Sequence, residues 1–178
     1  KSMSRAALIV IDVQNDYFPG GVFPLWNPEA ALAATLRAIR AAQAHGLPVI
    51  HVQHIATREG ATFFLPDTPG VAIHENVAPQ AGELVITKHF PNSFRQTGLL
   101  EQLRKRQTTT LVIAGMMTHM CIDTTTRAAA DLGFQCMLAH DACATRELSF
   151  GGLTVPAAQV QAAYLAALDG PFAQVRSA

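Results

Sequence analysis

The sequence carries little charge. Only 15% of its 178 residues are Asp, Glu, Lys or Arg, and the 13 basic residues balance the 13 acidic ones. The one basic cluster, residues 104–107, ends a helical pattern, where cations suit the helix dipole. We therefore expect no nucleic-acid partner. The low charge and the Ala-rich helical segments leave apolar surface uncovered, which favours a homodimer or homotetramer.

Long apolar runs and paired cysteines are also missing. No stretch has the length of a membrane span, and no signal-peptide pattern precedes the first strand. The three cysteines, Cys121, Cys136 and Cys143, are an odd number and form no CxxC motif. We therefore expect free thiols, a reducing compartment, a cytoplasmic protein and no membrane partner.

What the sequence does contain is an alternation of strand and helix patterns. Strands are predicted at residues 6–13, 47–55, 82–88, 109–115 and 135–142, and helices at 28–46, 97–107, 119–132 and 156–168. This alternation predicts an α/β fold, a three-layer α/β/α sandwich with a parallel sheet between the helices. We expect one domain over residues 3–178, with Lys1 and Ser2 outside it.

Reactive side chains follow the ends of the predicted strands, where sites gather in parallel sheets. Cys121 lies in "GMMTHMCID", between a strand and a helix, and a helix start favours the thiolate form of cysteine. Asp12 and Lys88 end two other strands. Each has an ordinary alternative: a core thiol, a turn cap, or a lysine that reaches solvent. Together they supply a nucleophile, a base and a cation, which suits attack on a carbonyl carbon. Cys136 and Cys143 are expected to be structural.

Three segments resemble the isochorismatase-like cysteine hydrolases, a family that includes nicotinamidase, N-carbamoylsarcosine amidohydrolase and isochorismatase. They are "LIVIDVQNDYFPGG", "TKHFPNSFRQTGLLEQLRKRQTTTLVIAGMMTHMCIDTTTRAAADLGF" and "AHDACAT". The resemblance extends from residue 6 to about 168. It implies a Rossmann-like sheet of order 3-2-1-4-5-6 and a catalytic triad of Asp12, Lys88 and Cys121. It also implies an oxyanion hole made by the N–H groups of Met117 and Cys121, with a cis peptide between Met116 and Met117.

The resemblance implies a cysteine hydrolase that cleaves a C–N bond of a small amide or carbamoyl substrate through a thioester. The presence of Cys121 favours this amide-hydrolase branch. Two alternatives stay open: an ether hydrolase of isochorismatase type, and a non-catalytic binding protein with the same fold.

We expect no cofactor and no metal. The Asp-x-His metal motif of nicotinamidases falls here on His54 and Ala56, so the pattern is broken. His51 and His54 should lie on opposite faces of a strand, and no other His, Cys or carboxylate is expected to complete a site around either. Candidate pocket residues, each with core packing or a turn as its alternative role, are Tyr17, Phe18, Phe23, Trp26, His54, Phe63, Phe64 and His119.

Overall fold

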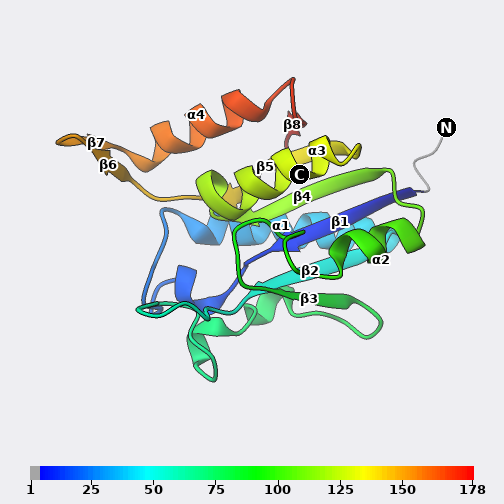
Figure 1. Ribbon diagram of the computed structural model, residues 1–178, viewed down its shortest axis with the longest axis horizontal. Coiled ribbons are helices and arrows are strands. Elements are labelled where there is room, and N and C mark those ends of the chain that lie inside the picture. The colour runs from blue at the N-terminus through cyan, green and yellow to red at the C-terminus, as the bar shows by residue number, and fades with distance from the viewer. Residues whose placement is uncertain (1–4) are drawn as a thin grey trace.

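The computed structural model describes residues 5–178, so the predicted domain start at residue 3 lies outside the described part. A parallel six-stranded sheet forms the centre, in the order β3-β2-β1-β4-β5-β8 (Figure 1). Its strands are β1 (Ala6–Ile11), β2 (Val49–His54), β3 (Leu84–Lys88), β4 (Thr110–Met116), β5 (Gln135–Ala144) and β8 (Gln174–Arg176). The predicted fold class and strand order are confirmed.

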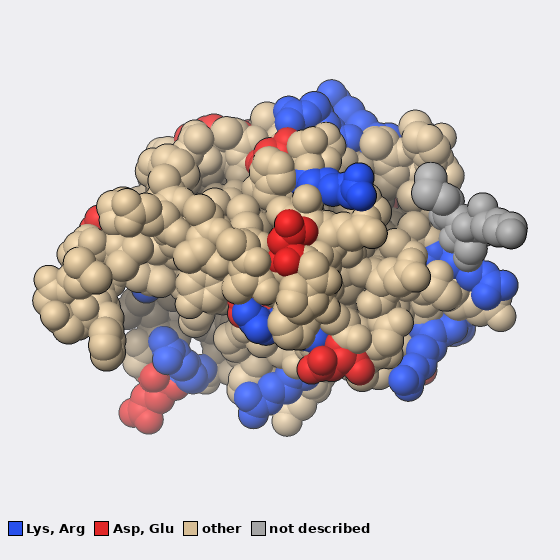
Figure 2. Space-filling view, turned by 90° about the horizontal axis from the view of Figure 1, so that it is seen from above, with Lys and Arg blue, Asp and Glu red and all other residues tan. Residues whose placement is uncertain are grey.

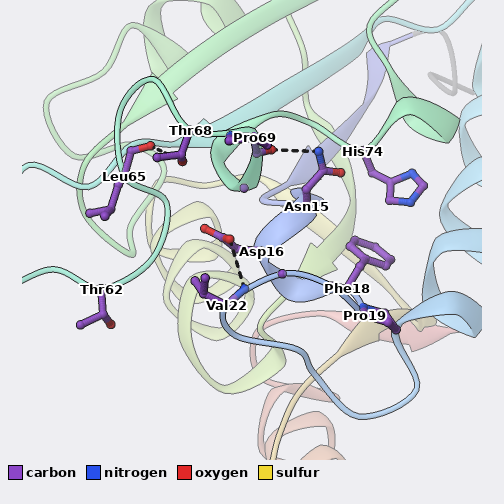
Figure 3. Close-up of a pocket in the computed structure, with 13 residues that line it drawn as sticks. Asn15, Asp16, Phe18, Pro19, Val22, Thr62, Leu65, Thr68, Pro69 and His74 are labelled. Carbon is purple, nitrogen blue, oxygen red and sulfur yellow. Dashed lines mark hydrogen bonds between the residues drawn. The ribbon is translucent and has the colours of Figure 1, made fainter.

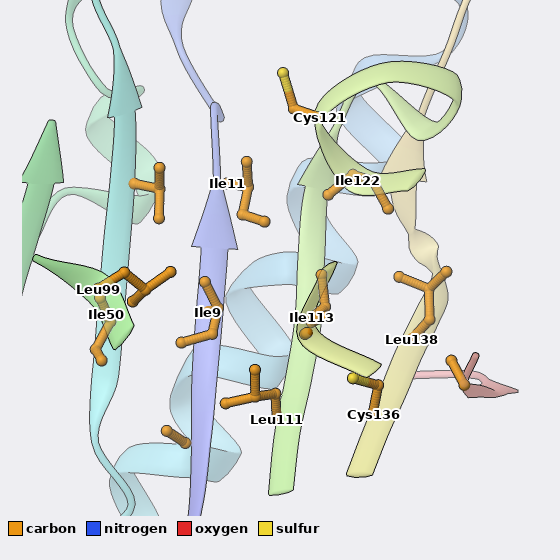
Figure 4. Packing of buried hydrophobic residues seen from close by; sticks show 14 of the residues in the cluster. Ile9, Ile11, Ile50, Leu99, Leu111, Ile113, Cys121, Ile122, Cys136 and Leu138 are labelled. Atoms are coloured by element: carbon orange, nitrogen blue, oxygen red, sulfur yellow. The ribbon is translucent and has the colours of Figure 1, made fainter. Parts of the chain in front are cut away.

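Helices cover both faces of this sheet (Figure 1). They are α1 (Pro28–Ala44) on one face, α2 (Leu99–Lys105) and α3 (Asp123–Asp131) on the other, and α4 (Ala157–Leu168), which packs beside α3. Alternate residues of β1 enter the two layers. Ile9 and Ile11 pack with Leu99 on the α2 side (Figure 4), whereas Leu8 and Val10 pack on the α1 side. Burial on both faces explains why this strand is a continuous apolar run.

The structure differs from the predicted elements in three places. The predicted helix at 119–132 is a π-helical turn, Thr118–Ile122, followed by α3. A short hairpin of β6 (Leu148–Phe150) and β7 (Leu153–Val155) was not predicted, nor was the position of β8. These strands have three residues each, too few to show a period. Cys143, one residue beyond the strand predicted at 135–142, lies inside β5.

The surface around α4 is nearly free of charge. This helix contains no charged residue, and only its Val160 and Leu168 are buried. In the neighbouring hairpin, Phe150 is 91% exposed and Leu153 67%. Figure 2 looks onto this side and shows a broad region without charged side chains. The homodimer or homotetramer stays a prediction. Within residues 5–178, no helix is both long and apolar enough to cross a membrane.

Candidate active site

The three predicted triad residues meet at the carboxyl ends of the central strands. Asp12 directly follows β1, Lys88 is the last residue of β3, and Cys121 lies in the π-helical turn after β4. Asp12 and Lys88 are fully buried and Cys121 is 6% exposed. Figure 4 shows Cys121 above the apolar layer, at the end of β4. Asp12 has a left-handed backbone, with φ of 56°, which turns the chain sharply out of β1.

Gly115 allows β4 to approach β1 closely at this end of the sheet. Gly115 is in register with Ile11, and its φ is 133°, where L side chains are strained. A Cβ atom placed on it would overlap the carbonyl oxygen of Ile11. Glycine is therefore required here, and it lets the segment that carries Cys121 cross next to Asp12.

The Lys88 ammonium group lies between the other members of the site. Its Nζ is 2.9 Å from Asp12 Oδ2, 3.2 Å from Cys121 Sγ and 2.7 Å from His54 Nδ1. Lys88 is in register with His54 on the neighbouring strand, so its side chain passes the end of β2 to reach Asp12 on β1. The ammonium group therefore forms an ion pair with Asp12 and hydrogen bonds with Cys121 and His54.

The charges of the site favour a cationic Lys88 and a neutral His54. Burial alone would lower the pKa of Lys88, but the Asp12 carboxylate and Cys121 outweigh burial and leave this pKa raised. Burial, and next the Lys88 charge, lower the pKa of His54 to about 4. An ammonium group has no lone pair, so Lys88 donates and His54 Nδ1 accepts. The proton of neutral His54 is therefore on Nε2.

The surroundings of Cys121 favour the protonated thiol over the thiolate in the free protein. Burial raises its pKa far above the ordinary value, the Asp12 carboxylate raises it further, and Lys88 opposes both. This direction is opposite to the one that a helix start was expected to give, where the thiolate is favoured. The argument from a helix start fails because Cys121 lies inside a buried π-helical turn and not at the exposed first turn of α3.

The backbone before Cys121 has the form that the resemblance implies. The peptide bond between Met116 and Met117 is cis. The N–H group of Met117 has no hydrogen-bond partner among residues 5–178, while its carbonyl oxygen accepts from the N–H groups of Met120 at 3.0 Å and Ile122 at 3.2 Å. The Met117 N–H is thus available to a ligand. That it converges with the Cys121 N–H on one oxyanion stays a prediction.

Gln161 of α4 holds this π-helical turn in place, and sequence reasoning missed it. Its Oε1 accepts a hydrogen bond from Thr118 Oγ1 at 2.6 Å, and its Nε2 donates to the carbonyl oxygen of Cys143 at 3.1 Å. The side chain therefore joins α4, the π-helical turn and the end of β5. The only signal in the sequence is an amide within an apolar helix, which is too weak to assign this role.

A cavity of about 270 Å³ opens onto Cys121. Tyr17, His54, Arg58, Phe63, Phe64 and Cys121 are among the residues that line it. Tyr17, His54, Phe63 and Phe64 thus lie where they were expected. Burial, together with the nearby Cys121 and Asp12, raises the pKa of the Tyr17 phenol well above its ordinary value, so this hydroxyl stays neutral.

Four other predicted pocket residues do not line this cavity. His119 is turned towards Thr145, with 2.6 Å between Nδ1 and Oγ1. Phe23 stacks on the ring of Phe63, and Trp26 is 52% exposed. Their places in the sequence, close to Cys121 or Asp12, did not reveal which way each side chain points.

Phe18, the fourth, lines a second cavity of about 470 Å³ (Figure 3). The ring of Phe18 packs against His74 there, with 4.6 Å between the centroids. The Asp16 carboxylate in its wall accepts from the backbone N–H groups of Phe64 at 2.7 Å and Val22 at 3.3 Å. None of the triad residues lines this cavity, so the smaller cavity above Cys121 is the candidate substrate pocket.

The expected arrangement of possible metal ligands is only partly correct. His51 and His54 do have separate partners, since His51 Nε2 lies 3.0 Å from Glu83. However, possible ligand atoms of Asp12, His54 and Cys121 all lie within 4.8 Å of one another, so the expectation that nothing joins His54 is wrong. The fold brings these residues together from distant parts of the chain. The position between them already contains the Lys88 ammonium group.

Comparisons with known proteins agree with this fold. The isochorismatase domain matches residues 6–177. The isochorismatase family protein YddQ of Bacillus subtilis is 47% identical over 96% of this chain and 95% of its own length. An isochorismatase-type hydrolase of known structure from Oleispira antarctica is 49% identical, with a TM-score of 0.94 over 99% of this chain and 95% of that one. Maleamate amidohydrolase of Pseudomonas putida is 29% identical over 80% of this chain and 73% of its own length. This chain therefore belongs to the isochorismatase family.

Proposed function

We propose that the protein is a cysteine hydrolase that cleaves the C–N bond of a small amide or carbamoyl substrate through a thioester intermediate. The observation that supports this most strongly is the buried Lys88 ammonium group, which contacts both Asp12 and Cys121 beneath a cavity. A nucleophile, a charge-stabilising cation and a carboxylate are the groups that acyl transfer requires. The hydrolases among its relatives, such as maleamate amidohydrolase, support the same reaction class.

In this proposal, Asp12 is the base that accepts the thiol proton. His54, the other candidate, has its Nδ1 lone pair engaged with Lys88 and carries a proton on Nε2. Lys88 is cationic and has no lone pair to offer. Asp12 Oδ1 has no hydrogen-bond partner among the described residues, so it is available to accept a proton. Possible ligand atoms of Asp12 and Cys121 lie within 4.8 Å of each other. Catalytic hydrogen bonds are often long in a free enzyme and shorten when the substrate binds, so this separation is compatible with proton transfer to Asp12.

The cycle has two halves with balanced protons. Asp12 takes the Cys121 proton as Sγ bonds to the carbonyl carbon, and the oxyanion is bound by the N–H groups of Met117 and Cys121. When the C–N bond breaks, the leaving nitrogen takes the proton from Asp12. A water molecule then gives a proton to Asp12 and attacks the thioester. The C–S bond breaks, the acid leaves, and the Cys121 thiolate recovers its proton from Asp12.

The test is ammonia release from a panel of small amides and ureides by the wild-type protein, Cys121→Ala and Cys136→Ala. Cys136 is buried far from the triad in the same apolar layer, so it is a matched control (Figure 4). We expect turnover to vanish only in Cys121→Ala, with a thioester to Cys121 trapped by rapid acid quench and found by mass spectrometry. Full activity of Cys121→Ala would refute the nucleophile. Turnover of isochorismate alone would favour the ether hydrolase.

A further inference from the structure

The cavity above Cys121 has a wall of hydrogen-bond donors and no acidic lining residue. Its lining contains Arg58, His54 and His89 but no Asp or Glu. Asp12 lies below this wall, and its charge is matched by Lys88 at 2.9 Å. The rest of the lining is largely apolar and aromatic. A substrate that enters this cavity therefore meets positive charge that no acidic lining residue balances.

The position of each donor follows from its hydrogen bonds. His54 accepts from Lys88 through Nδ1, so it presents Nε2–H on its free side. His89 Nδ1 lies 2.8 Å from the carbonyl oxygen of Ile55 and must donate to it, which anchors the imidazole at the cavity wall. Neutral His54 can only donate at Nε2, so it suits an acceptor on the substrate, such as a carbonyl or carboxylate oxygen.

Arg58 is the charged member of this wall. Arg58 is exposed to solvent, and no salt bridge among the described residues involves it. Arg58 and His89 both interact electrostatically with His54, and each contributes to lowering the pKa of that imidazole. An arginine without a partner, at the wall of a cavity that lacks acidic groups, suits a carboxylate, which guanidinium binds with two parallel hydrogen bonds.

We infer that the substrate carries a carboxylate beyond its scissile amide, and that Arg58 binds this carboxylate while His54 donates to an oxygen nearer the scissile bond. This inference rests on the proposed function and narrows it to small anionic amides. The cavity of about 270 Å³ limits the substrate to a short chain between the two groups. Neutral amides of the same size are then poorer substrates.

The first experiment compares the half-amide of a four-carbon dicarboxylic acid with its neutral methyl ester, using ammonia release. We expect the acid to have a kcat/KM about tenfold higher, because one charge-assisted hydrogen bond from Arg58 is lost with the ester, and Arg58 is exposed to solvent. Arg58→Gln should bring this ratio close to one, mainly through a higher KM for the acid. Arg104→Gln, which removes the positive charge of an exposed residue in α2, is the matched control and should keep the ratio.

The second experiment needs no turnover, so it separates this inference from the proposed function. The dicarboxylic acid and its neutral diamide are tested as protectants of Cys121 against iodoacetamide, with the alkylated peptide identified by mass spectrometry. Protection by the acid alone, weakened in Arg58→Gln but not in Arg104→Gln, supports the inference even if no amide is hydrolysed. Equal protection by both compounds, or an unchanged effect in Arg58→Gln, overturns it. If every amide resists hydrolysis while protection is specific, the proposed function fails and the anion site stands.

Discussion

Lys88→Met tests the central feature of the site, a buried cation that stabilises two acidic groups. The substitution replaces the apolar stem of the side chain with that of methionine but removes the ammonium group that contacts Asp12 at 2.9 Å and Cys121 at 3.2 Å. Asp12 then remains fully buried without a counter-charge. Both stability and reactivity should fall, for the same electrostatic reason.

The expected magnitudes follow from complete burial. Breaking a buried ion pair on one side costs about 3–5 kcal/mol of unfolding free energy, because the remaining charge is uncompensated. If Asp12 is the partner of this ion pair, Lys88→Met should lower the unfolding free energy much less in an Asp12→Asn background. The coupling energy between the two substitutions should be about 2 kcal/mol or more. Amide turnover should fall by about a hundredfold or more, since a preorganised charge is lost from a dry site.

The assay is urea unfolding of the two single variants, the double variant and the wild type. Lys105→Met at the end of α2 is the matched control, and it should stay within about 0.5 kcal/mol of wild type, since Lys105 is exposed. Alkylation of Cys121 by iodoacetamide at pH 7 should slow in Lys88→Met. Equal cost in both backgrounds together with unchanged alkylation would refute the reasoning.

Three further predictions concern protonation, metal and packing. Because the pKa values of His54 and His119 are lowered to about 4, the unfolded chain binds more protons below pH 6.5, so stability should fall from pH 6.5 towards pH 4. Urea midpoints at pH 7 and pH 5 should show this loss, and His54→Asn should reduce it. Activity should persist after dialysis against a chelator, since Lys88 occupies the position among the possible ligands; activity lost and then restored by zinc would contradict this. Gly115→Ala should destabilise the fold by about 3 kcal/mol or more, because its Cβ meets the Ile11 carbonyl; an unchanged urea midpoint would contradict it.

The sheet and the triad were accessible from the sequence because both depend on strand ends. A continuous apolar run such as that of β1 predicts a buried parallel strand, and the rule of carboxyl ends then selects the residue after it, Asp12. The strand order, implied by the family resemblance, brings Asp12 next to Cys121. The pattern identifies which residues end the strands, but not how far a side chain reaches. The pattern of strand ends therefore could not predict that the Lys88 side chain passes the end of β2 to reach Asp12.

The parts that sequence reasoning missed depend on tertiary contacts with little local signal. The π-helical turn at Thr118–Ile122 runs directly into α3, and nothing in the residue pattern distinguishes its hydrogen bonds from those of an α-helix. Gln161 acts across three elements that are distant in sequence. Arg58 lies in a long loop, which lacks the residue periodicity that predicts where side chains point in a helix or strand. Only the three-dimensional cavity distinguishes it from other surface arginines.

Burial of the site explains why a protonated thiol suits the proposed reaction better than a resting thiolate. In the free protein, the Asp12 carboxylate and the Lys88 ammonium cancel, and the neutral Cys121 thiol adds no charge. A resting thiolate beside a charged Asp12 would leave one net negative charge in a site that is almost entirely closed to water, which is costly. Transfer of the thiol proton to Asp12 avoids that cost, because the thiolate and Lys88 then form the ion pair and the total charge stays at zero. In the proposed reaction, the thiolate therefore forms only as the proton moves, during attack on a bound carbonyl. On this argument, the alkylation rate of Cys121 in the free protein should rise with pH well beyond neutrality; a plateau reached below pH 7 would show a resting thiolate and contradict it.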